Sequence, residues 1–181
     1  SVSAFLLNRS SDLLVINAYV SLENGGVYWG HRHPTEDISS FDGMKLYSVD
    51  FYAYDPGEYQ LLVFKGATTS EDYTIPAEQV LCQSQTVASS GWYTIDLNEP
   101  VIIDGEQDLW LFMHDSESIP NIRIDVCNAT GTNGCYYSTN LSEYTYNNYN
   151  NYAFLIKAYL TDGTYTYSLS DNGTLLNNGT T

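Results

Sequence analysis

Short runs of alternating apolar and polar residues dominate this chain, and the clearest pair of runs lies in residues 45–64. There, two strand-like runs flank the turn sequence Asp55-Pro56-Gly57-Glu58. In a β-turn, proline presets φ at the first corner, glycine accepts the second, and aspartate bonds back to its own backbone. The segment is therefore predicted to be a β-hairpin near the centre of an antiparallel sheet.

The rest of the chain repeats this pattern. Further strands are expected at residues 13–22, 27–33, 79–87, 92–97, 101–103, 108–114, 122–126, 135–138 and 152–160. Turn sequences rich in glycine, asparagine and aspartate separate many of them, and no stretch has sustained helical periodicity. The pattern predicts an all-β fold, an antiparallel β-sandwich, with the jelly roll as the favoured type.

The character of the chain changes after Asp162. Residues 1–162 are expected to form the sandwich domain. Residues 163–181 contain a second turn sequence, Asp171-Asn172-Gly173, between two short strand-like runs. This tail is predicted to be a separate hairpin or linker, or the start of a further β module.

The composition fits one folded domain. A chain of 181 residues with 43% hydrophobic content can fill one core but is short for two. The net charge is −16 and the six Lys and Arg residues are scattered, which argues against nucleic acid as a partner. No run approaches the roughly 20 apolar residues of a membrane helix, so membrane insertion is not expected. The first residues lack the pattern of a signal peptide, and the chain is expected to be a mature protein or an excised fragment.

The three cysteines leave two readings open. Cys127 and Cys135 bracket a short polar loop, so a local disulfide and two free thiols are both compatible with the spacing. Cys82 has no evident partner and is expected to lie in a strand as a small apolar residue.

Three stretches carry a resemblance to a known family. They are residues 27–66, which include VYWGHRHPTEDISSFDGMKLYSVDFYAYDPG, residues 89–113, which read SSGWYTIDLNEPVIIDGEQDLWLFM, and the closing run NYAFLIKAYL at 151–160. In order and spacing they resemble the cleaved-adhesin, jelly-roll modules of Bacteroidetes surface and secreted proteins, including the haemagglutinin/adhesin regions of gingipains. A related lectin-like module of secreted papain-type peptidases shares part of the pattern.

The resemblance implies an extracellular accessory module without catalytic activity. Its expected partners are a glycan or a host or other extracellular protein, together with neighbouring domains of a larger parent protein. The motifs are mainly turn glycines and core aromatics, which specify a fold more than a ligand. Structural calcium occurs in some modules of this kind.

Calcium also has a candidate ligand set in the residues themselves. Asp104, Glu106 and Asp108 alternate across a turn, and oxygen ligands in loops are what Ca²⁺ takes in proteins. The alternative is that Asp104-Gly105 is simply a β-turn.

Other site chemistry is less well supported. His31 and His33 lie on one strand face, and with His114 they have the residue types of a zinc site, although ordinary strand residues are the favoured interpretation. No nucleophile motif is present. Carboxylate pairs for glycoside hydrolysis are available among 22 acidic residues, but most of these lie in turns, so an enzyme is not predicted.

Exposed aromatic rings next to amide and carboxylate groups are the chemistry of sugar binding. The tract 142–152 interleaves asparagines with the candidate ligand-binding residues Tyr144, Tyr146, Tyr149 and Tyr152, and Trp29 is a second candidate. The alternative is a Tyr- and Asn-rich loop without a ligand, or aromatic cross-strand pairs. Trp92 and Trp110 are expected in the core.

Together these observations predict a non-catalytic extracellular adhesin or carbohydrate- or protein-binding module within a larger surface or secreted protein. A structural accessory domain of a secreted peptidase is the alternative, and a small glycan-active hydrolase is a less favoured one.

Overall fold

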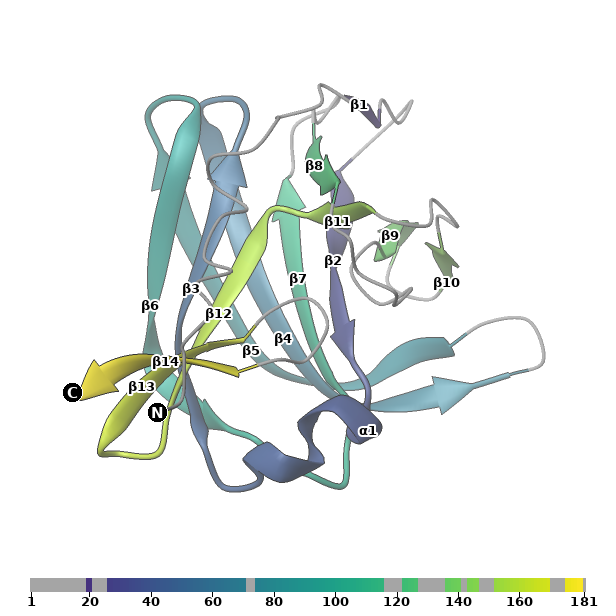
Figure 1. Cartoon of the computed structure of the whole chain (residues 1–181). Coiled ribbons are helices and arrows are strands. Elements are labelled where there is room, and N and C mark those ends of the chain that lie inside the picture. Colours follow the sequence, from purple (N-terminus) through teal and green to yellow (C-terminus); the bar gives the residue numbers. More distant parts are fainter. Residues whose placement is uncertain are drawn as a thin grey trace.

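The computed structural model describes residues 19–20, 26–70, 74–115, 122–126, 136–140, 143–146, 152–169 and 175–180. Two large antiparallel sheets stack as two layers (Figure 1). The β7 sheet has the order β10 (Glu143–Tyr146), β9 (Tyr136–Asn140), β2 (Val27–His33), β7 (Leu109–Asp115), β4 (Gly57–Thr69) and β5 (Thr74–Val87). The β3 sheet has the order β14 (Leu175–Thr180), β13 (Tyr165–Leu169), β12 (Ile156–Thr161), β3 (Lys45–Ala53) and β6 (Gly91–Ile102).

A third, small sheet and one short helical segment complete the described fold. The small sheet joins β1 (Tyr19–Val20), β8 (Ile122–Val126) and β11 (Tyr152–Phe154). Helix α1 (Thr35–Ile38) and the 3-10 turn η1 (Ser39–Phe41) lie across one end of the sandwich (Figure 1). The prediction of an all-β, antiparallel sandwich is confirmed, and the jelly-roll type stays a prediction.

The main core fills the space between the two large sheets. Alternate residues of each strand point inward, as the period of two requires. On β3 these are Leu46, Val49, Phe51 and Ala53, all fully buried, and β4 contributes Leu61 and Val63 from the opposite layer.

A second apolar cluster covers the other face of the β7 sheet. It consists of Leu62, Phe64, Trp110, Phe112 and Tyr136. Strand β7 is therefore buried on both faces, which explains why its sequence, LWLFM, is continuously apolar instead of alternating. Gly30 of the neighbouring strand β2 is packed so closely that a Cβ atom there would overlap the Leu111 carbonyl oxygen and lie 2.8 Å from the Phe112 Cα.

The predicted hairpin at 45–64 is wrong in its pairing. Strand β3 pairs with β6 and β12, whereas β4 pairs with β5 and β7, so the two strands lie in different sheets. The chain does reverse at the predicted turn, but the turn carries it from one layer to the other. Turn chemistry specifies a local reversal, and the choice of sheet depends on both strands directing their apolar faces into one core.

The closing strand also differs from the prediction. The run 152–160 is split at Leu155 into β11 and β12, which belong to different sheets. In the tail, β13 pairs with both β14 and β12, so these strands continue the β3 sheet. The division of the chain after residue 162 stays a prediction. Cys82 is exposed and free, and Cys127 and Cys135 lie outside the described residues.

Candidate functional site

The outward side of the β3 sheet carries an exposed tryptophan. Trp92 lies near the start of β6 and is 43% exposed, so the prediction that it belongs to the core is wrong. The register explains this, because Trp92 stands opposite Tyr52 of β3, and Ile95 and Leu97 of the same strand take the inward positions. The indole packs edge-on against the Tyr52 ring, with 5.7 Å between centroids and 89° between planes.

A polar row lies beside this ring pair. Asp50, two residues from Tyr52 on β3, is the cross-strand partner of Thr94 on β6 and of Lys157 on β12. The Thr94 hydroxyl donates to Asp50 Oδ1 at 2.6 Å, and the Tyr159 hydroxyl donates to Asp50 Oδ2 at 2.5 Å. Each carboxylate oxygen is thus held by one hydroxyl group, which fixes the orientation of the carboxylate.

Tyr159 links this row to the rest of the sheet. Its ring lies 6.3 Å from that of Tyr47, and Lys157 places its ammonium 5.2 Å from the Tyr159 ring centroid. Burial and the hydrogen bond to Asp50 raise the pKa of the Tyr159 phenol above its ordinary value. The phenol therefore stays protonated at neutral pH and remains a donor to Asp50.

We call the set Asp50, Tyr52, Trp92, Thr94, Lys157 and Tyr159 the Trp92 face. It offers an exposed ring for stacking and, one cross-strand row away, a fixed acceptor and an ammonium donor. Aromatic surface combined with a few placed polar groups is what small-ligand recognition requires. The alternation of β3 and β6 contained the signal for this site, since Asp50, Tyr52, Trp92 and Thr94 occupy the outward positions.

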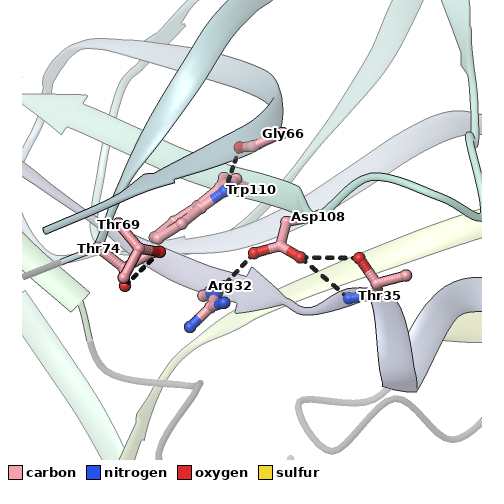
Figure 2. Close-up of polar contacts among 7 residues, drawn as sticks. All are labelled: Arg32, Thr35, Gly66, Thr69, Thr74, Asp108 and Trp110. Carbon is pink, nitrogen blue, oxygen red and sulfur yellow. Dashed lines mark hydrogen bonds and ion pairs between the residues drawn. The ribbon is translucent and has the colours of Figure 1, made fainter.

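The residues proposed for calcium are engaged in other contacts (Figure 2). One oxygen of Asp108 accepts a hydrogen bond from Arg32 Nε at 2.8 Å, and the other accepts one from the Thr35 backbone N–H at 3.0 Å. Asp104 accepts the Glu106 backbone N–H at 2.9 Å, as expected of a turn residue. No group of three metal-binding side chains occurs in the part of the chain that the structure describes. Calcium, with these three residues as its ligands, stays a prediction.

The Asp108 contacts have an evident structural role. They fasten the first residue of α1 to the start of β7, while the Arg32 guanidinium lies 5.4 Å from the Trp110 ring centroid. Trp110 in turn donates from Nε1 to the Gly66 carbonyl at 2.9 Å (Figure 2). Trp110 is fully buried, which confirms its predicted place in the interior.

The aromatic residues predicted to bind ligand are placed differently. Trp29 is 4% exposed and packs inside the main core against Tyr59, so its ring faces no solvent. Tyr144 and Tyr146 belong to β10 and Tyr152 belongs to β11, in a different sheet. Tyr149 lies outside the described residues, as do the side chains of the other three tyrosines.

The three histidines are not brought together. His31 and His33 share the inward face of β2, with ring centroids 6.0 Å apart, and His31 Nε2 lies 2.8 Å from the Phe154 carbonyl oxygen. His114 lies on the opposite face of the β7 sheet, stacked on Tyr28. His33 is buried, and neither of its ring nitrogens has a hydrogen-bond partner. Its pKa is lowered to about 3, mainly by burial and to a smaller extent by the nearby His31.

A cleft of about 540 Å³ separates the outer edges of β5 and β6. Both strands are bulged there, β5 at Val80 and β6 over residues 97–100. The Gln83 side chain spans the gap, donating to the Asp96 carbonyl at 2.8 Å and accepting the Asn98 backbone N–H at 3.0 Å. The Gln83 side-chain amide thus links β5 to the backbone of β6 across the cleft, where no strand pairing joins them in the described part of the chain.

Comparison of the chain with protein-family models, with curated proteins and with solved structures finds no match. The resemblance to adhesin modules therefore stays a prediction from sequence motifs. Among the described residues, no helix has the length and apolar character needed to cross a bilayer.

Proposed function

We propose that this chain is a non-catalytic glycan-binding module of an extracellular or surface protein, and that it binds through the Trp92 face. The observation that carries the proposal is the 43% exposure of Trp92 beside a carboxylate fixed by two hydroxyl donors. A sugar ring stacks its C–H face on an indole, and its hydroxyl groups then meet acceptors and donors at the edge.

The shape of the site supports binding more than catalysis. Both oxygens of Asp50 accept hydrogen bonds from hydroxyl groups, so this side chain is held in place as an acceptor for the donors of a ligand. The Trp92 face is also part of a sheet surface, where a ligand stays open to water. Glycoside hydrolysis needs one protonated and one ionised carboxyl group flanking the scissile bond.

A direct test compares two exposed residues of the same strand. Trp92→Ala should weaken binding of the ligands found on a glycan array by about tenfold or more, because it removes the stacking surface. Ile102→Ala removes another exposed apolar side chain of β6, 55% exposed, and should leave binding unchanged. Circular dichroism and thermal unfolding would confirm that both variants fold.

Two results would overturn the proposal. Absence of any glycan ligand for the wild-type protein would remove the function itself. Loss of binding in a Tyr144, Tyr146 and Tyr149 triple alanine variant, with full binding by Trp92→Ala, would move the site to the Tyr- and Asn-rich tract.

A further inference from the structure

Asp50 is a half-buried carboxylate without a cationic partner in the described part of the chain. Lys157 is its cross-strand neighbour, but the ammonium lies over the Tyr159 ring. The ion pair that the described residues form is Arg32 with Asp108, in the other sheet. The described partners of Asp50 are therefore two hydroxyl donors, one on each oxygen, and each oxygen has remaining acceptor capacity.

Trp92 likewise has an uncovered ring. Among the described residues, cations lie over the rings of Trp110 and Tyr159, and none lies over Trp92. An exposed indole beside an unneutralised carboxylate is suited to an ammonium group, which gains from both the ring quadrupole and the negative charge.

The charge of the whole chain acts in the same direction. With a net charge of −16, the protein attracts cations and repels anionic ligands over distances of about a Debye length. Asp96 is exposed two residues from Thr94, on the same outward side of β6, and adds a second negative charge near the site.

We infer that the Trp92 face binds a glycan with free amino groups, and that the ammonium of an amino sugar lies between the Asp50 carboxylate and the Trp92 ring. This inference rests on the proposed glycan-binding function and narrows its ligand class. It predicts discrimination against uronic-acid and sulfated glycans, whose charge Asp50 and Asp96 repel.

The test uses oligosaccharides that differ only in the amine. Chitosan oligomers carry free ammonium groups, and fully acetylated chitin oligomers of the same length carry neutral amides. Calorimetric titration at low salt should give a dissociation constant about tenfold lower for chitosan, equivalent to about 1.4 kcal/mol.

Two variants locate the preference. Asp50→Asn should abolish the difference between chitosan and chitin. Glu58→Gln removes the same charge from an exposed position on β4, in the other sheet, and should preserve the difference. Equal losses in both variants would assign the preference to general charge and overturn the inference.

The outcomes separate the two proposals. Equal affinity for chitosan and chitin, or tighter binding of chitin, overturns the amino-sugar inference and leaves glycan binding intact. Absence of binding to every oligosaccharide on an array overturns the function. If Asp50→Asn fails to fold, Lys157→Met is the alternative variant. It keeps both hydrogen bonds of Asp50 and removes the cation that competes with the ligand ammonium, so the preference for chitosan should increase. An unchanged preference contradicts the inference.

Discussion

His33 makes the stability of this protein sensitive to mild acid. The imidazole is buried with both nitrogens unpaired, and its pKa falls from 6.5 to about 3. In the unfolded chain the same side chain binds a proton near its ordinary pKa. The unfolded state therefore holds more protons than the folded state between these two values, and the free energy of unfolding must decrease as the pH falls below about 6.5.

The size of this effect follows from the pKa difference. Each pH unit below the unfolded pKa costs about 1.4 kcal/mol, so lowering the pH from about 7 to about 5 should remove about 2 kcal/mol through His33 alone. A loss of this size is a substantial part of the stability of an ordinary domain, about 5–15 kcal/mol.

The perturbation that isolates this effect is His33→Leu. Leucine fills a similar space without polar atoms, so at neutral pH the variant should be within about 1 kcal/mol of the wild type or more stable. The stability difference in favour of the variant should then grow by about 2 kcal/mol toward pH 5. Urea unfolding at several pH values, followed by tryptophan fluorescence, measures both quantities, and carboxylates common to the two proteins cancel in the difference.

His114 provides the matched control. It is half-buried, and its Nδ1 lies 3.2 Å from Gln60 Oε1. Burial lowers its pKa, and the nearby Asp115 offsets part of this change. His114→Gln should therefore change the pH dependence less than His33→Leu. Parallel stability curves for His33→Leu and the wild type, within about 0.5 kcal/mol from pH 7 to pH 5, would refute the reasoning.

Two further changes test the packing around the β7 sheet. Asp108→Ala removes the acceptor of Arg32 and Thr35 and should lower the free energy of unfolding by about 2–3 kcal/mol. The loss is smaller than for a fully buried ion pair because Arg32 is partly exposed. The melting temperature should fall by about 5–10 °C. Adding Arg32→Met to that variant should recover part of the loss, and failure to do so would contradict an uncompensated guanidinium as its cause. Gly30→Ala should prevent stable folding, because the new Cβ overlaps the backbone at Leu111; wild-type urea unfolding of this variant would contradict the close approach of β2 and β7.

The fold class was accessible from sequence because strand alternation and turn chemistry are local properties. The Asp55-Pro56-Gly57 turn lies where its residues predict it, yet the partners of β3 and β4 do not follow from it. Pairing depends on which strands share a core, and residues far apart in the chain decide that. Leu155 shows the same limit, since nothing in the run 152–160 signals that the chain changes sheets there.

The site was harder to predict, because residue type alone does not reveal which face of a strand is covered. Trp29 and Trp92 both lie in alternating strands, and the register places one ring inside the sandwich and the other outside. Asp50 was identifiable only as one acid among many. Its importance comes from Tyr159, which reaches it from a strand 109 residues further along the chain.

The bulged edges of β5 and β6 have a consequence for crowding. An unbulged edge strand is a template on which another chain can add a strand. Here Val80 and residues 97–100 interrupt the edges, and Gln83 already occupies backbone groups of β6. Copies held at high local concentration, as in a tandem array, would therefore stay separate along these edges instead of fusing into a continuous sheet, and each copy would keep its Trp92 face available.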